Sequence, residues 1–196
     1  MSDSTNPNAS FQLILDTAEK LIDEKGCRQT TLQDIIERSG LSKGAIYHYV
    51  SGKDELFGRI LISKMETIND SFNESVSQAS KGDAASPVQL IAKGMLANTD
   101  SQSVTNKIFT YLLSQSDNPK IAAILNNLYH YTLRLSTEWI KIGQTSGAIP
   151  PHIDAAKMSM LFTIFTYGLR TQRVITKDED QVDFEDIFRL IFRSLQ

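Results

Sequence analysis

Four neighbouring residues between positions 43 and 48 have the chemistry to contact a nucleic acid. Lys43 carries a cation that attracts phosphate, and Tyr47 and His48 carry groups that can bond to phosphates and base edges. Gly44 lies among them and costs a helix roughly 0.5 to 1 kcal/mol relative to alanine, which a close approach of the bare backbone to DNA would offset. The alternative is an ordinary surface turn.

Two short helices joined by a turn are expected to position this group. Thr31 and the acid three residues later have the spacing of a capping box, and Gly40 stands where a helix often ends in a left-handed residue. Ser42 then caps a second helix, in which Ile46 and Val50 can face inward together. The pattern predicts a helix-turn-helix, whose second helix enters the major groove of DNA.

Residues 44–56 resemble the signature of the TetR family of bacterial transcriptional regulators. They match a pattern close to G-x-[LI]-Y-x-[HY]-[FV]-x-x-K-x-[DE]-L, and the similarity extends over residues 10–60. The resemblance implies a DNA-binding domain of three helices, followed by a helical domain for ligand binding and dimerisation. It also implies DNA contacts at Thr31, Gln33, Lys43, Gly44, Tyr47, His48 and Lys53.

Three further residues complete the predicted DNA-binding surface. Ser42 lies at the cap of the second helix, Ala45 can meet a thymine methyl group, and Tyr49 can reach a phosphate. For Tyr49 we favour a packing role, with half of its ring against the first helix. Lys53 is expected to contact the DNA backbone, whereas Gln33 and Lys43 would carry sequence information.

The charge of the chain is unevenly distributed. Its net charge is -3, but residues 25–64 contain seven basic and four acidic residues, a local net charge of +3. Residues 178–186 contain six acids. Because the local sign of the charge decides where phosphate is attracted, the acidic total does not exclude DNA binding.

Composition indicates a soluble cytoplasmic protein without membrane association. The chain has 196 residues, of which 41% are apolar, and no run of about 18 consecutive apolar residues occurs. No charged-then-apolar leader opens the sequence. Cys27 is the only cysteine, which excludes an internal disulfide and indicates a small, partly buried side chain.

Motifs for catalysis, metal binding and cofactor binding are absent from the sequence. His48, His130 and His152 are the only histidines, and none has the spacing of metal ligands. The sequence has no G-x-S-x-G elbow, no P-loop and no G-x-G-x-x-G turn. We therefore expect a protein that is not an enzyme and needs no metal or cofactor.

Helical periodicity dominates the chain and predicts an all-α protein of eight to ten helices. We divide it into a disordered arm (1–9), a helix-turn-helix domain (10–55) and a helical effector-binding and dimerisation domain (56–196). The helix from about Lys53 to Ser80 connects the two domains. The remaining helices are expected after Pro87 and over residues 104–116, 119–144, 151–176 and 184–195.

The second domain contains aromatic residues that can line an apolar cavity, although each one alone is more typical of a packed core. Its last two helices are apolar over a wide arc, which either a four-helix interface between two subunits or a fully buried helix in a monomer would bury, and the family resemblance implies the dimer. The predicted pocket residues are Met95, Phe109, Tyr129, Phe162 and Phe165. The predicted interface residues are Met158, Leu161, Leu169, Phe188 and Phe192.

Together with the resemblance, these patterns predict a homodimeric repressor that binds a palindromic operator in double-stranded DNA. Half-sites of the operator would lie about 34 Å apart, or a multiple of it. A small apolar or amphipathic effector in the second domain would release the DNA. The alternative is a DNA-associated helical adaptor whose second domain binds a protein partner.

Overall fold

The computed structural model describes residues 7–78, 99–147, 149–177 and 186, and this part of the chain is helical throughout, without a strand. Met95, Phe188 and Phe192, together with the helices predicted after Pro87 and from residue 184, lie outside the described residues. The described helices are α1 (Pro7–Gln29), α2 (Leu32–Ser39), α3 (Lys43–Tyr49), α4 (Lys53–Gln78), α6 (Val104–Leu113), α7 (Pro119–Thr145) and α8 (Ala155–Thr176). The prediction of an all-α architecture is confirmed.

Helix α1 begins earlier than expected, because residues 7–9, predicted to be part of a disordered arm, already belong to it. Its apolar face points into the structure, with Ile14, Ala18 and Ile22 fully buried. Regular helical geometry is interrupted at Gly26, whose φ of 79° marks a kink before the last turn.

The two short helices have the caps that the sequence predicts, two where a helix begins and one where a helix ends. The Thr31 hydroxyl accepts a bond from the backbone N–H of Asp34, whose carboxylate accepts one from the backbone N–H of Thr31. Gly40 ends α2 with a φ of 70°, a conformation that glycine adopts without steric cost. Ser42 caps α3 by accepting a bond from the backbone N–H of Ala45. These caps set the geometry of the helix-turn-helix.

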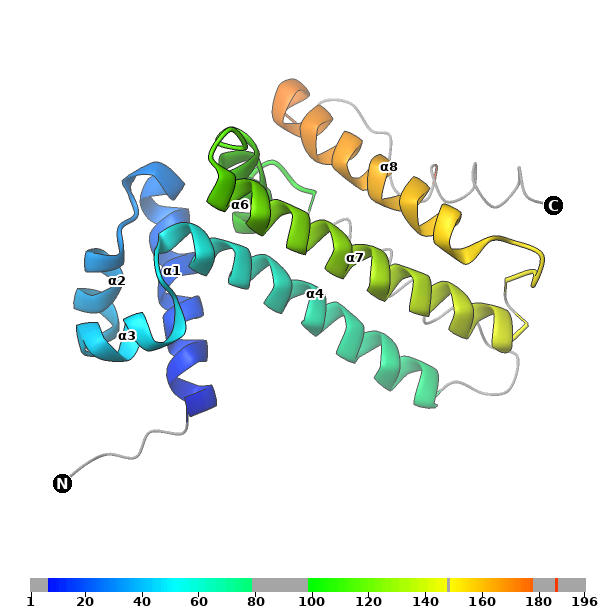
Figure 1. Ribbon diagram of the computed structural model, residues 1–196, viewed down its shortest axis with the longest axis horizontal. Helices are drawn as coiled ribbons and strands as arrows, with labels where there is room; N and C mark the ends of the chain where they lie inside the picture. The colour runs from blue at the N-terminus through cyan, green and yellow to red at the C-terminus, as the bar shows by residue number, and fades with distance from the viewer. Residues whose placement is uncertain (1–6, 79–98, 148, 178–185, 187–196) are drawn as a thin grey trace.

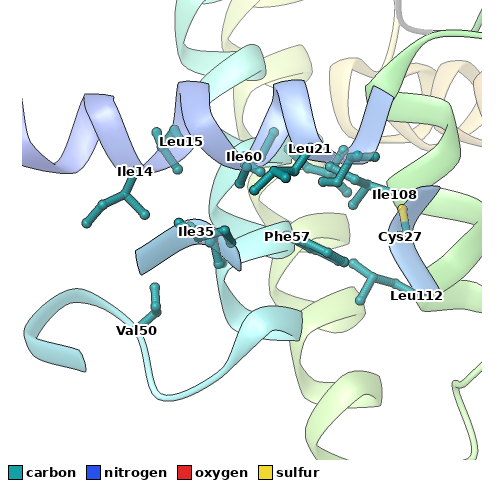
Figure 2. Close-up of a cluster of buried hydrophobic side chains, with 14 of the residues drawn as sticks. Ile14, Leu15, Leu21, Cys27, Ile35, Val50, Phe57, Ile60, Ile108 and Leu112 are labelled. Carbon is teal, nitrogen blue, oxygen red and sulfur yellow. The ribbon is translucent and has the colours of Figure 1, made fainter. Parts of the chain in front are cut away.

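One hydrophobic cluster joins the DNA-binding unit to the rest of the chain. It contains inward-facing residues of α1, α2 and α3, the first half of α4, and parts of α6 and α7. Phe57 and Ile60 of α4 lie in it beside Ile108 and Leu112 of α6, and all four are fully buried (Figure 2). The boundary predicted near residue 55 therefore does not separate two cores.

A second cluster holds the far half of the molecule together. Helix α7 lies between α4 and α8 and packs against both (Figure 1). Phe72 of α4 packs against Trp139 of α7, with ring centroids 5.8 Å apart, and Met158 and Phe162 of α8 complete the cluster. Helix α4 thus spans both clusters and connects the two ends of the structure.

The crossing of α4 and α7 is tight at Gly58. A Cβ atom at this position would lie 2.5 Å from Cγ2 of Ile124, closer than real Cβ contacts allow. The two helices can approach this closely only because residue 58 has no side chain. Gly58 lies within the first cluster, so this crossing ties α7 to the part of α4 that supports the DNA-binding unit.

Candidate functional site

Helix α3 presents the predicted polar group to solvent. Lys43, Gly44, Tyr47 and His48 are exposed, whereas Ile46 is fully buried beneath them. The Lys43 ammonium lies 5.7 Å from the centroid of the Tyr47 ring, a cation–π contact on the outer surface. The four residues therefore share one exposed face of α3, and Lys43 and Gly44 occupy its first turn, the part that enters the major groove in helix-turn-helix proteins.

Gly44 has no structural requirement inside the chain. A Cβ atom there would have Ser42 Oγ at 4.0 Å as its nearest neighbour, which is ordinary van der Waals contact. The helix would be more stable with alanine at this position. A glycine that the fold does not need is consistent with a close approach of another molecule.

Tyr49 anchors α3 to α1. Its ring stacks on Phe11 with centroids 5.1 Å apart, and the His48 ring lies nearly perpendicular to it with a centroid distance of 5.2 Å. The expectation that half of the Tyr49 ring packs against the first helix is confirmed. A phosphate contact from its hydroxyl stays a prediction.

The start of α2 carries a network of polar groups. The Lys25 ammonium lies 2.8 Å from Asp34 Oδ2, which also accepts bonds from the Thr31 hydroxyl and backbone N–H. These donors, with Lys25 foremost, lower the pKa of Asp34 to about 2. Gln33 is exposed, and its amide donates to Glu37 at 2.8 Å. The predicted contact residues of α2 thus lie at the surface, with their orientation set by neighbouring acids.

Much of the positive charge counted in residues 25–64 is already paired. Four of the seven cations form ion pairs, namely Lys25 with Asp34, Arg38 with Glu24, Arg59 with Glu55 and Lys64 with Glu19. Within this described range, Arg28 and Lys43 are the cations left with neither an acidic partner nor a backbone acceptor. Because Lys43 lies on the exposed face of α3, it is the leading candidate for attracting DNA there.

Lys53 has a different environment from the one that we expected. Its ammonium donates to the backbone carbonyls of Cys27, Arg28 and Thr30, each at 3.2 Å, and lies 5.3 Å from the centroid of the Tyr111 ring. All three of its protons therefore have acceptors at the end of α1. The geometry supports a structural role for Lys53, and its contact with phosphate stays untested.

The described residues show no metal site and no membrane-spanning helix. They include no group of three or more metal-binding side chains, and none of their helices is both long and apolar enough to cross a bilayer. Cys27 is buried in the first cluster, where burial raises the pKa of its thiol to about 11. It therefore stays protonated and behaves as a small apolar side chain, as the sequence indicated.

A cavity of about 380 Å³ opens between α6, α7 and α8. Of the predicted pocket residues, Phe109 and Tyr129 line it. The other lining residues are Leu113, Ser116, Ala122, Leu125, Asn126, Tyr167 and Thr171. The Phe109 and Tyr167 rings form an aromatic pair with centroids 4.7 Å apart.

Phe162 and Phe165 line neither this cavity nor its smaller neighbour. Both pack into the second cluster instead, with Phe162 buried and Phe165 partly buried. Their predicted place in a ligand pocket stays a prediction. They lie on the side of α8 that meets α4 and α7, which periodicity alone cannot distinguish from a cavity wall.

Of the three predicted interface residues on α8, two are buried in the chain and one is exposed. Met158 and Leu169 are each only 4% exposed and belong to the chain's own core, so they are not available to a partner subunit. Leu161 is 45% exposed, as an interface residue must be. It lies in an apolar stripe that we had not resolved, formed by Met160, Leu161, Ile164 and Ile175.

The sequence analysis also missed a row of polar residues inside α8. Ser159, Thr163, Thr166 and Arg170 recur at spacings of four, three and four residues, and all four are buried. This spacing places them on one face of the helix. Polar residues at helical spacing within an otherwise apolar helix were the signal that could have revealed them.

Comparison with known proteins agrees with this architecture. Residues 14–60 match the model of a family described as bacterial regulatory proteins, tetR family. A relative in Bacillus subtilis (strain 168), the uncharacterised HTH-type transcriptional regulator YfiR, is 24% identical over 171 residues. That match covers 87% of this chain and 82% of YfiR.

Solved structures show the same fold over nearly the whole chain. GusR of Salmonella enterica superimposes with a TM-score of 0.66 at 22% identity, covering 99% of this chain and 98% of GusR. A complex of SmeT with triclosan has a TM-score of 0.57 at 17% identity, covering 85% of this chain and 81% of SmeT. The family match places the helix-turn-helix segment, residues 14–60, among bacterial regulatory proteins of the tetR family, and the solved structures show that the fold is shared beyond this segment.

Proposed function

We propose that the protein is a homodimeric repressor that binds a palindromic operator and releases it when a small apolar or amphipathic ligand binds. The observation that carries the proposal is the exposed face of α3, where Lys43, Gly44, Tyr47 and His48 meet on one surface. Lys43 and Tyr47 would read base edges or hold phosphates, and Gly44 would admit the DNA backbone closely. The flanking residues of α2 would set the register on the duplex.

Dimerisation is proposed through the exposed stripe of α8. Ile164 is 62% exposed and Ile175 is 74% exposed, an unusual location for large apolar side chains along one helix face. Two copies of such a stripe can bury each other about a two-fold axis. The same axis would relate two α3 helices, which matches the symmetry of a palindromic operator.

Ligand response is proposed through the cavity of about 380 Å³ between α6, α7 and α8. Phe109 and Leu113 of α6 line it, while Lys107 of the same helix forms an ion pair with Asp23 of α1 at 2.9 Å. Tyr111, also on α6, donates a hydrogen bond to Asp54 at the start of α4. Helix α6 therefore contacts both the cavity and the support of the DNA-binding unit.

A ligand in this cavity would shift α6, and α6 would move α1 and α4 with it. The ligand can release DNA only if it binds the DNA-incompetent arrangement more tightly than the competent one. The complex of the structural neighbour SmeT with triclosan supports a small-molecule site in this fold.

The first experiment is selection of bound duplexes from a random DNA pool, followed by titration of the enriched sequence across a salt series. We expect enrichment of a palindrome and binding by two protomers, measured by the mass of the complex. Lys43→Ala should reduce discrimination between this operator and random DNA by roughly 1 to 3 kcal/mol. Lys141→Ala, on the exposed surface of α7, is the matched control and should leave discrimination unchanged.

The interface is tested by Ile164→Asp, which should give a monomer that folds but loses operator affinity. Leu13→Asp, at an exposed position of α1, serves as the control for adding a charge to an apolar surface residue. Failure to enrich any sequence, with only weak and salt-sensitive binding, would reject the operator. A dimer that survives Ile164→Asp would instead move the interface away from this stripe.

A further inference from the structure

We infer that the ligand of this protein carries an acidic group and that the guanidinium of Arg170 binds it. The inference deepens the proposed ligand response and rests on that proposal for its regulatory meaning. It starts from a positive charge enclosed between α6 and α8, for which the described part of the chain shows no ion pair.

Arg170 is only 9% exposed, and its hydrogen bonding is incomplete. One terminal nitrogen, Nη1, donates to the carbonyl of Thr105 at 3.3 Å, and the guanidinium carbon lies 4.8 Å from the centroid of the Phe109 ring. The Nε atom is buried and has no hydrogen-bond partner. Burial lowers the pKa of Arg170 to about 10, so the side chain is still a cation at neutral pH.

Among the described residues, the groups around Arg170 do not neutralise it. Burial raises the pKa of the nearby Tyr167 hydroxyl, which is therefore uncharged at neutral pH. Lys64 lies along the same cavity and is itself a cation, paired with Glu19 at 2.7 Å. A buried charge without a counterion carries a large desolvation cost. The site is electrostatically incomplete until an anion enters.

A small cavity of about 30 Å³ lies against Arg170. Four threonines share its wall with Arg170 and Tyr167, namely Thr105, Thr132, Thr163 and Thr166. The space holds about two water molecules, which is close to the size of a carboxylate group. The Thr132, Thr163 and Thr166 hydroxyls donate to carbonyls of their own helices at 2.8 to 2.9 Å. Each can rotate to donate to a bound anion instead.

The apolar part of the ligand has space next to this site. Phe109 and Tyr167 line both the small cavity and the cavity of about 380 Å³, so the aromatic pair forms the wall between them. Leu113, Leu125 and Ala122 give the larger cavity an apolar lining. A ligand with an acidic head and an apolar body, such as a carboxylic acid with an alkyl or aromatic tail, fits this combination.

Entry of such a head group would separate the Phe109 and Tyr167 rings. Phe109 belongs to α6, whose next residues contact the start of α4, because Tyr111 bonds to Asp54 and packs its ring against Phe57. Binding of an acid at Arg170 would therefore act directly on the helix that connects the cavities to the DNA-binding unit. An uncharged ligand confined to the larger cavity has no comparable reason to displace Phe109.

The inference is tested on the whole protein without DNA, by calorimetry and thermal unfolding. The probes are straight-chain carboxylates from hexanoate to hexadecanoate and the alcohols of the same chain lengths. We expect at least one acid to bind and to raise the unfolding temperature, with the matching alcohol binding roughly ten- to a hundredfold more weakly, the range of a lost hydrogen bond to a charged group. Equal binding of acid and alcohol, or binding of no acid, overturns the inference.

Two substitutions locate the effect. Arg170→Met keeps the length and apolar stem of the side chain and should abolish the preference for acid over alcohol. It should leave the unliganded protein as stable as before or more so, because it removes an uncompensated buried charge. Arg173→Met, three residues further along α8 and only partly buried, should keep the preference. Retention of the preference in Arg170→Met, or its loss in Arg173→Met, would also overturn the inference.

The outcomes separate this inference from the proposed function. The comparison of acid and alcohol on the unaltered protein decides the inference even if Arg170→Met does not fold. If acids and alcohols bind equally and both release the operator, the ligand-responsive repressor stands and the role of Arg170 falls. If acids bind through Arg170 but no ligand changes operator affinity, the acid site stands and the proposed release of DNA falls.

Discussion

The surface of α3 and the cavities beside α8 are organised in opposite ways. At α2 and α3 the caps join residues three positions apart in the chain, namely Thr31 with Asp34 and Ser42 with Ala45. At α8 the polar contacts join distant segments, as in the bond from Arg170 to the carbonyl of Thr105, 65 residues away. The proposed DNA-binding surface is therefore encoded locally, whereas the cavity exists only through packing of helices that are far apart in the sequence.

This difference between local and long-range contacts should determine how substitutions in each region affect the protein. The α3 surface is a set of exposed side chains on a short helix, whose position depends on the first hydrophobic cluster beneath it. The cavity region depends on α6, α7 and α8 meeting, and its described residues include two buried polar atoms without partners, Arg170 Nε and Asn106 Oδ1. We expect substitutions at the α3 surface to change operator affinity more than the free energy of unfolding. Substitutions in the hydrophobic clusters should change the free energy of unfolding, and only those beneath α3 should also change operator affinity.

The largest expected effect comes from removing an aromatic side chain from each cluster. Phe57→Ala and Phe72→Ala should each lower the free energy of unfolding by roughly 3 to 5 kcal/mol, because both rings are buried and leave cavities. Under conditions where both variants are folded, only Phe57→Ala should also weaken operator binding. Urea unfolding followed by circular dichroism, with operator titration, measures both. Equal loss of operator affinity would show that the clusters act as one unit.

Lys53 lies at the border between the two regions, and its substitution should change the free energy of unfolding more than operator affinity. Lys53→Met keeps the alkyl chain beside Tyr111 but removes the donor to three carbonyls, so unfolding should become easier by roughly 1.5 to 3 kcal/mol. The slope of log K against log salt should stay unchanged. A slope that flattens by about 0.9 would instead identify Lys53 as a phosphate contact. Lys43→Met, on the exposed face of α3, provides the comparison.

Gly44 should change stability and DNA binding in opposite directions. Because a Cβ atom has space there, Gly44→Ala should stabilise the free protein by roughly 0.5 to 1 kcal/mol. The same methyl group should weaken operator binding if the DNA backbone approaches this position. Thermal unfolding of the variant measures the change in stability, and operator titration of the same variant measures the change in affinity. Improved stability with unchanged binding would remove Gly44 from the interface.

The smallest effect is expected from pH. The pKa of Asp34 is lowered from 3.8 to about 2, so its contribution to stability is present above the ordinary value and is lost as the pH falls toward 2. Asp34→Asn removes this dependence. Between pH 4 and pH 2 the unfolding temperature of the wild type should fall more than that of the variant. Parallel curves would mean that the network with Lys25 and Thr31 adds little to folding.

Local rules explain why the DNA-binding unit was predictable. Capping patterns, the glycine at the end of α2 and apolar spacing each act over a few residues, so Thr31, Gly40 and Ser42 could be assigned from the sequence. Tyr49 could also be assigned, since its position on α3 directs it toward α1. The charge estimate was less accurate, because a sum over residues 25–64 cannot show which cations meet an acid from another helix.

The second half of the chain was predictable as helices but not as surfaces. Periodicity identified α7 and α8, yet it could not decide which apolar face packs inward, so Met158 and Leu169 were assigned to an interface and are core residues. It also could not show that Lys53 would meet the end of α1. Both outcomes depend on how the helices cross, as at the contact of Gly58 with Ile124.

The sequence by itself determined the helices, their caps and the exposed group on α3, because these depend on spacing and on bonds between near neighbours. Only the tertiary structure decided which charges remain unpaired, which face of α8 is buried, and that Arg170 lies beside a cavity. Those properties arise where α6, α7 and α8 come together, and no short stretch of the chain contains all of the atoms involved.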